Sequence, residues 1–261
     1  MITKRFWQLS SIATLAFALV ANFVVATQRV DVPSINALSD KYASLLTPAD
    51  YAFGIWSVIY SLLILFVIYQ ARDILKPNKT NELPLKTGFW FAVASICNGI
   101  WTYIFVKEWI GLSVIVLLLL VASLYTLLGR LRIAVYDAPI KVIVCVWWPL
   151  MLYTGWVTVA AVVNIASWMT SHGVVLSPFL ACWVLVGLMF GLLALLVSRN
   201  VRELLLASIW GIAAVGVRQT QLKGSAVVAT TAFVVSGVLL VAVAIHAYKN
   251  RRANPFLPGQ K

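Results

Sequence analysis

The chain has 261 residues, of which 62% are hydrophobic and 11% are charged, and it carries a net charge of +12 at pH 7. A composition this apolar excludes a water-soluble globular domain and indicates a polytopic membrane protein. The apolar runs are long and continuous, whereas the strands of a membrane β-barrel alternate over about ten residues. The predicted fold class is therefore all-α, a polytopic bundle of about eight transmembrane helices in one domain.

Eight apolar segments follow one another along the chain. They cover residues 6–27, 51–71, 87–106, 109–128, 142–169, 174–197, 204–217 and 225–248. All but 204–217 are long enough to cross about 30 Å of hydrocarbon at a rise of about 1.5 Å per residue. The first segment starts like a signal peptide, with Lys4 and Arg5, but its apolar run is too long and its small-x-small cleavage pattern is poor. We expect it to be a retained helix.

The distribution of basic residues predicts the topology. With the N-terminus in the cytoplasm and eight crossings, fifteen of the twenty basic residues lie on the cytoplasmic side: Lys4, Arg5, Arg72, Lys76, Lys79, Lys86, Arg130, Arg132, Lys141, Arg199, Arg202, Lys249, Arg251, Arg252 and Lys261. The other side holds Arg29, Lys41, Lys107, Arg218 and Lys223. This is the positive-inside pattern, so the basic charge indicates topology and not nucleic-acid binding. If 204–217 did not cross, the last helix would reverse and carry its basic end outside. We predict an inner-membrane protein with both termini in the cytoplasm, embedded in the lipid bilayer and with no nucleic-acid partner.

Three stripes of aromatic and amide side chains stand out within the apolar segments. In chain order they are Phe53, Trp56 and Tyr60; Asn98, Trp101, Thr102 and Phe105; and Trp156, Ala160 and Asn164. Each recurs at helical spacing and so lies on one face of its helix. The simpler interpretation is that these residues pack helices together, which membrane helices do routinely. The alternative is that three such faces enclose a flat-walled aromatic pocket in the outer half of the bundle, under the long connection 28–50, which would act as a lid.

Groups for acid–base, nucleophilic or metal chemistry are scarce. Cys97, Cys145 and Cys182 lie in apolar runs and are expected to be small buried hydrophobic residues, and neither His172 nor His246 belongs to a metal-ligand pattern. The acidic residues Asp50, Glu108 and Asp137 lie at helix ends, so none is placed near the membrane midplane, where ion-coupled transporters need one. We predict no catalytic residues and no metal site.

The three stripes resemble motifs of the tryptophan-rich sensory protein family, also called the translocator protein family. The segment from Thr47 to Tyr60 is similar to the entry of that family's second helix, which has a proline followed by W-V-F-G-x-x-W and then a tyrosine. The stripe that begins at Asn98 resembles its third-helix N-x-x-W-S-x-x-F, and the stripe that begins at Trp156 resembles its fifth-helix W-V-x-x-A-x-x-x-N. The resemblance covers about residues 1–170. It implies a five-helix core over 1–170, with 171–261 forming three additional helices packed on it.

The resemblance also implies a ligand and a site. Family members bind tetrapyrroles such as protoporphyrin, and sterols, in an aromatic pocket beneath the first loop. The site residues predicted here are Phe53, Trp56, Tyr60, Asn98, Trp101, Trp156, Ala160 and Asn164. The porphyrin, whether protoporphyrin or haem, would be a ligand and not a required cofactor, and a homodimer is one arrangement that the resemblance allows.

Three functions remain open from the sequence. The first is a binding or sensor protein for porphyrins or other planar apolar molecules. The second is a facilitator or transporter of porphyrin-like or lipid-like molecules through the same pocket. The third is a membrane enzyme that breaks porphyrin down in light through the pocket tryptophans.

Overall fold

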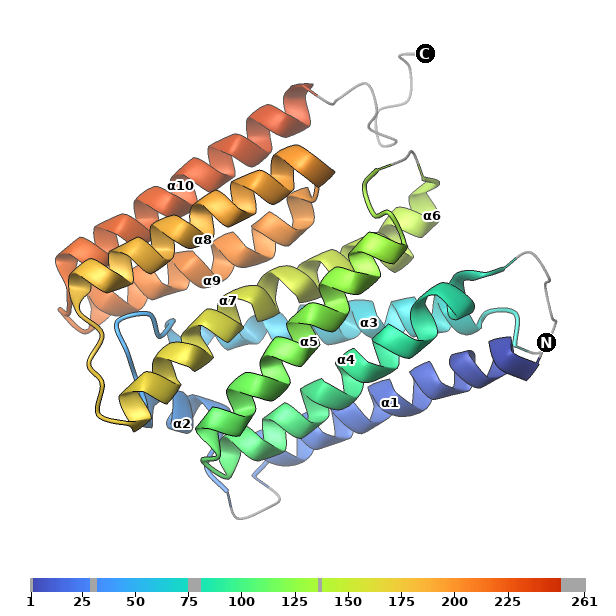
Figure 1. The fold of residues 1–261 in the computed structure, drawn as a ribbon, viewed down its shortest axis with the longest axis horizontal. Coiled ribbons are helices and arrows are strands. Elements are labelled where there is room, and N and C mark those ends of the chain that lie inside the picture. Colours follow the sequence, from blue (N-terminus) through green and yellow to red (C-terminus); the bar gives the residue numbers. More distant parts are fainter. Residues whose placement is uncertain (1, 29–31, 75–80, 136–137, 250–261) are drawn as a thin grey trace.

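The computed structural model describes residues 2–28, 32–74, 81–135 and 138–249 and shows an all-α bundle (Figure 1). Its long helices are α1 (Ile2–Ala26), α3 (Ile55–Ala71), α4 (Leu83–Val106), α5 (Ile110–Arg130), α7 (Trp148–Ser171), α8 (Pro178–Arg199), α9 (Arg202–Gln221) and α10 (Ala226–Lys249). Short elements complete the list: α2 (Ile35–Lys41), η1 (Asp50–Gly54), α6 (Ile140–Val142) and η2 (Ile143–Trp147).

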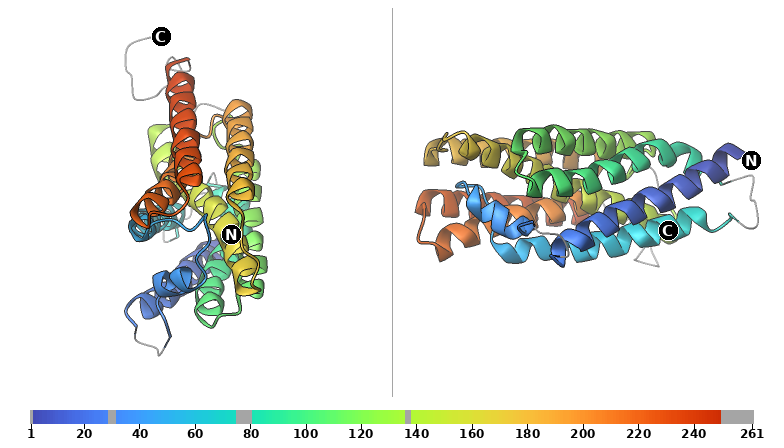
Figure 2. Two further views of the ribbon diagram at one scale, coloured as in Figure 1. Left: turned by 90° about the vertical axis from the view of Figure 1, so that its left-hand side faces the viewer. Right: turned by 90° about the horizontal axis from the view of Figure 1, so that it is seen from below.

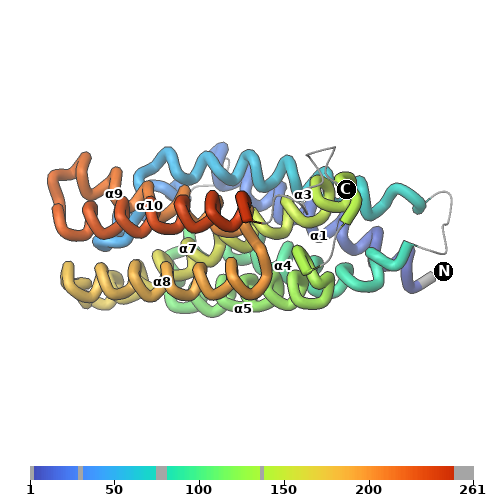
Figure 3. Tube along the Cα trace, turned by 90° about the horizontal axis from the view of Figure 1, so that it is seen from above, coloured from blue at the N-terminus to red at the C-terminus, as the bar shows by residue number. Residues whose placement is uncertain are grey.

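The long helices run roughly along one axis, which makes the molecule longer than it is wide (Figure 2). Seen from above, α5 and α8 lie along one side and α3, α9 and α10 along the other (Figure 3). Helix α7 joins the two parts of the bundle, since it packs against α3 and α5 on one side and against α9 on the other. Helix α10 packs on α8 and α9, so the last three helices form one group attached through α9.

Within the described residues, seven helical segments are long and apolar enough to cross a membrane. The exception is α9, the segment for which the sequence predicted the shorter range 204–217. In the structure α9 extends over Arg202–Gln221, 20 residues, or about 30 Å of helix. It runs beside α10 along the bundle (Figure 1). It is less apolar than the other long helices, and its polar side chains include Arg218 and Gln219, which contact a neighbouring segment.

The two ends of the bundle differ. One end holds the start of α1 and the end of α10, as an even number of crossings requires, and the opposite end holds α2 (Figure 1). We call them the terminal end and the α2 end. Among the described basic residues, ten belong to the terminal end: Lys4, Arg5, Arg72, Lys86, Arg130, Arg132, Lys141, Arg199, Arg202 and Lys249. Four belong to the α2 end: Lys41, Lys107, Arg218 and Lys223. Arg29, Lys76, Lys79, Asp137, Arg251, Arg252 and Lys261 lie outside the described residues.

The first helix is an integral part of the bundle. Its Trp7 and Phe17 pack against Gly88 and Gly99 of α4 so closely that a Cβ atom at either glycine would lie within 2.5 Å or 2.6 Å of the aromatic residue. Small residues of this kind let membrane helices approach each other.

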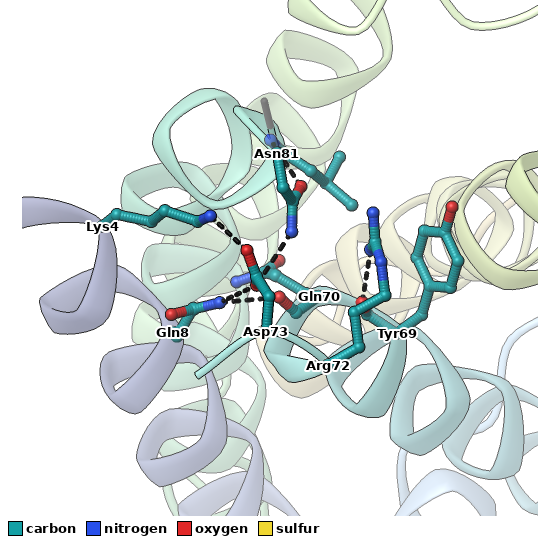
Figure 4. A network of polar contacts seen from close by, with 8 residues as sticks. Lys4, Gln8, Tyr69, Gln70, Arg72, Asp73 and Asn81 are labelled. Atoms are coloured by element: carbon teal, nitrogen blue, oxygen red, sulfur yellow. Dashed lines mark hydrogen bonds and ion pairs between the residues drawn. The ribbon is translucent and has the colours of Figure 1, made fainter. Parts of the chain in front are cut away.

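A buried polar network fixes the same helix at the terminal end (Figure 4). Gln8 donates hydrogen bonds to the backbone oxygen of Gln70 (3.0 Å) and to Asp73 Oδ1 (2.7 Å), and Lys4 forms an ion pair with Asp73. Asn81 donates to Asp73 Oδ1 at 3.0 Å. Burial raises the pKa of Asp73, but the hydrogen bonds from Lys4, Asn81 and Gln8 outweigh that effect, so its pKa lies below the usual carboxyl value.

One helix contains an irregular turn. Residues Ile140–Ser171 form a continuous helical segment in which Ile143–Trp147 is a π-helix. Pro149 stands two residues after this turn. It has no backbone N–H, and its ring would clash with the carbonyl four residues earlier in a regular helix. The wider turn accommodates this proline. The three cysteines are free, with Cys97 buried and Cys145 and Cys182 half-buried.

Candidate functional site

A cavity lies at the α2 end, bounded by α3, α4 and α7 and covered by α2 and the segment that follows it. The space not filled by atoms is about 490 Å³, and part of it is open to the outside. Its lining consists of Ile35, Ser39, Pro48, Phe53, Trp56, Trp101, Phe105, Trp156, Val159, Ala160, Val163, Asn164 and Ser167. None of these lining residues is charged.

Edge-to-face contacts arrange the aromatic residues on the α3 and α7 side. The rings of Trp56 and Trp156 have centroids 6.2 Å apart at an interplanar angle of 85°, and Phe53 meets Trp156 at 6.1 Å and 82°. These geometries bring the positive edge of one ring to the negative face of another. The wall is therefore a set of rings that orient each other.

The α4 wall is a stacked aromatic pair with one polar support. Trp101 and Phe105 stack with centroids 5.2 Å apart and planes 20° from parallel. The indole Nε1 of Trp101 donates a hydrogen bond of 2.8 Å to Asn164 Oδ1, and Asn164 Nδ2 donates one of 2.9 Å to Ser113 Oγ on α5. Ser113 Oγ in turn lies 2.7 Å from the backbone oxygen of Ile110, to which it donates. A buried chain of hydrogen bonds thus fixes the orientation of Trp101.

Two of the predicted site residues, Tyr60 and Asn98, do not line the cavity and lie one turn deeper. Tyr60 stacks on Trp56 with centroids 5.0 Å apart, and its hydroxyl donates to Asn98 Oδ1 at 3.1 Å. Asn22 of α1 donates to the same oxygen at 2.9 Å and accepts a hydrogen bond of 3.0 Å from Thr102. Tyr60 and Asn98 therefore support the floor and tie α1, α3 and α4 together.

One buried donor at the cavity, the indole Nε1 of Trp156, has no hydrogen-bond acceptor among the described residues. Buried donors normally find a partner in protein or ordered water, so this N–H is available to a water molecule or a ligand atom.

The other six predicted residues line the cavity: Phe53, Trp56, Trp101, Trp156, Ala160 and Asn164. The site prediction omitted Phe105, although it stands four residues after Trp101 in the same stripe. It also omitted Val159, Val163 and Ser167, which extend the stripe of Trp156 at helical spacing and could have been found by continuing it. These residues lie on the same face of α7 as Ala160 and Asn164.

The cover was predicted only as an irregular loop. Residues Ile35–Lys41 in fact form helix α2, whose N-cap is Ser34; its Oγ accepts a hydrogen bond of 3.1 Å from Ala37 N. Helix α2 contributes Ile35 and Ser39 to the lining, and Pro48 comes from the segment after it. Seven residues are too few for a hydrophobic period to stand out, so the sequence pattern did not reveal this helix.

Comparison with known proteins gives one match. No curated protein and no solved structure matches the chain. A protein-family model described as TSPO-like protein matches residues 8–245 and therefore includes α8, α9 and most of α10 as well as the first five long helices. The match agrees with the family indicated by the three stripes and with a multi-pass membrane protein. The chain belongs to the TSPO-like protein family.

Proposed function

We propose that this membrane protein binds a planar, largely apolar small molecule, a porphyrin or a sterol-like compound, in the cavity at the α2 end. The observation that supports this most directly is the convergence of Trp56, Trp101 and Trp156, from three different helices, on one uncharged space. Flat aromatic walls favour a flat ligand because ring stacking adds to the gain from apolar burial.

Small side chains of α7 border the cavity on one side. Ala160 lies on α7 between Trp156 and Asn164 on the lining face, with Val159 and Val163 beside it. The polar groups available to the ligand are few: the amide of Asn164, the hydroxyls of Ser39 and Ser167, and the free indole N–H of Trp156. A ligand with carboxylates, such as protoporphyrin, would have to keep them towards the open side, since charged groups are costly to bury without partners.

Filling the cavity tests the proposal. Protoporphyrin added to the purified protein should quench tryptophan fluorescence saturably, and a sterol that competes should reverse the quenching. Replacing Ala160→Phe should abolish saturable quenching because the ring occupies the ligand's space. Ala194→Phe is the matched control, since Ala194 is exposed on α8 and away from the lining.

The control should bind as the unmodified protein does, and both variants should remain folded by circular dichroism. Unchanged protoporphyrin affinity in Ala160→Phe would place the ligand elsewhere. Quenching that does not saturate in the unmodified protein would reject the porphyrin as a ligand.

A further inference from the structure

Helix α9 contacts the cover of the cavity along one face. We define the cover as residues 35–53, which include α2 and most of η1. Trp210 Nε1 donates a hydrogen bond of 3.0 Å to the backbone oxygen of Ala52, and the backbone oxygen of Ala214 accepts one of 3.0 Å from Ala49 N. One turn further along α9, Arg218 reaches the cover as well.

Arg218, at the end of this row of contacts, forms the charged contact with the cover. Arg218 Nη2 lies 2.7 Å from Asp40 Oδ1, and its Nη1 lies 3.7 Å from Asp50 Oδ1, so one guanidinium bridges both ends of the cover's central segment. The arginine side chain is only 13% exposed, whereas Asp40 is 47% exposed and Asp50 is 63% exposed. Partial burial of the cation strengthens the pairing relative to a fully solvated surface ion pair.

The neighbouring glutamine adds a neutral contact. Gln219 Nε2 donates to the backbone oxygen of Leu45 at 3.0 Å, while its Oε1 accepts a hydrogen bond of 3.1 Å from the N–H of Ser225, which directly precedes α10. The amide is thereby fixed from both sides. The backbone of Leu45, in the middle of the cover, is tied directly to α9.

These contacts follow the geometry of a helix face. Trp210, Ala214 and Arg218 are spaced four residues apart, so they form a strip about 12 Å long at about 1.5 Å per residue. No residue of α9 lines the cavity itself. The cover residues that contact this strip, which are Asp40, Ala49, Asp50 and Ala52, do not line the cavity either.

We propose that α9 holds the cover closed over the cavity and that the ion pairs of Arg218 control how often the cover opens. The C-terminal helices would thereby set the rate of ligand exchange. This inference rests on the proposed binding function for its ligand, but the contact itself is independent of any ligand. At its other side the cover is held by Lys41 and Tyr42, which donate to Glu108 Oε2 at 2.6 Å and 2.5 Å between exposed side chains. Opening at α9 thus leaves a second attachment in place, and the cover can swing without being released.

The first experiment weakens the contact between α9 and the cover. Arg218→Gln keeps a polar side chain but removes the charge, and Lys223→Gln is the matched control because Lys223 is an exposed cation at the same end of α9. Hydrogen exchange of the peptide that spans residues 42–52 should be faster in Arg218→Gln than in the control. Dissociation of protoporphyrin should become about tenfold faster, with a smaller change in the control.

The second experiment links the cover covalently to α9. The backbones of Ala49 and Ala214 are in hydrogen-bond contact, so Ala49→Cys with Ala214→Cys, in a background with the three natural cysteines replaced, should form a disulfide. The oxidised protein should bind and release protoporphyrin at least about tenfold more slowly than the same protein after reduction.

The two proposals fail in different ways. If the unmodified protein does not bind protoporphyrin, the proposed ligand is wrong, and hydrogen exchange alone decides whether Arg218 holds the cover. Equal rates of hydrogen exchange in the Arg218 and Lys223 variants would overturn the proposal that Arg218 holds the cover closed. Binding and release rates that are the same in the oxidised and reduced double-cysteine protein overturn it as well, even if binding is confirmed.

Discussion

At the residue scale, a single buried serine, Ser113, supports the Trp101 wall of the cavity through hydrogen bonds. Ser113 and Ser123 are both buried on α5, and both donate to a backbone oxygen of their own helix at 2.7 Å. Only Ser113 also accepts the hydrogen bond of Asn164 Nδ2, whose Oδ1 holds the indole of Trp101. Ser113 does not line the cavity, so any effect on a ligand must pass through Asn164.

We predict that Ser113→Ala weakens protoporphyrin binding about threefold to tenfold, which corresponds to ~0.7–1.4 kcal/mol. Loss of the hydroxyl leaves a buried amide hydrogen unsatisfied and frees Trp101 to rotate. Titration by tryptophan fluorescence measures the affinity, and Ser123→Ala serves as the control. Equal affinities in the two variants would show that the hydrogen bond to Asn164 does not position the wall.

At the element scale, the lengths of the long helices followed from apolar runs, but their contacts did not. The predicted segments 142–169 and 204–217 extend to Ile140–Ser171 and Arg202–Gln221 in the structure. At the end of the second segment, Arg218 and Gln219 contact Asp40 and Leu45, and a sequence window does not show such contacts. Likewise, six cavity residues could be predicted from helical stripes. The contribution of α2 could not, since it depends on where a short segment folds back.

The contact of α7 with α9 depends on a missing side chain. A Cβ atom built on Gly155 would lie 2.1 Å from the backbone oxygen of Leu204, and Ser208 Oγ donates to the backbone oxygen of Gly155 at 3.1 Å. Backbone atoms cannot move aside as a flexible side chain can. Gly155 also precedes Trp156, so the same approach sets the position of a cavity wall.

We therefore predict that Gly155→Ala destabilises the protein by about 1–3 kcal/mol through overpacking. Gly187→Ala on α8 is the control, because no atom lies within 4 Å of the Cβ built there. Thermal unfolding in detergent compares the two variants. A melting temperature for Gly155→Ala as high as that of the control would contradict the close approach of α7 and α9.

The attachment of α1 should depend on pH. The pKa of Asp73 is lowered in the folded protein, so its ionised form stabilises the fold above the unfolded pKa of about 3.9. That stability is lost as the pH falls through the lower, folded-state pKa.

We predict that the melting temperature falls on acidification below about pH 4 and that Asp73→Asn reduces this fall. Glu82→Gln is the control, because Glu82 makes an exposed ion pair with Lys86 at 3.1 Å on the same side of the bundle. If the melting temperature of Asp73→Asn fell on acidification as much as that of the unmodified protein, the network around Asp73 would not cause the pH dependence.

At the scale of the whole molecule, charge and topology point the same way. Ten of the described basic residues belong to the terminal end and four to the α2 end, the asymmetry that the positive-inside rule associates with a cytoplasmic terminal end. The arrangement requires α9 to cross, although it is the least apolar of the long helices. With that topology, the cavity and its cover would face away from the cytoplasm.

The ends of α9 provide the test of this topology. Arg199, just before α9, and Lys223, just after it, are both exposed. In a background without natural cysteines, we predict that Lys223→Cys reacts with a membrane-impermeant maleimide in cells whose inner membrane is intact, and that Arg199→Cys reacts only after the cells are lysed. The reason is that the two positions are separated by about 30 Å of helix, the thickness of the hydrocarbon core. Labelling of both positions from outside, or of neither, would mean that α9 lies on one side of the membrane. Labelling of Arg199→Cys alone would keep the eight-helix bundle but reverse its orientation.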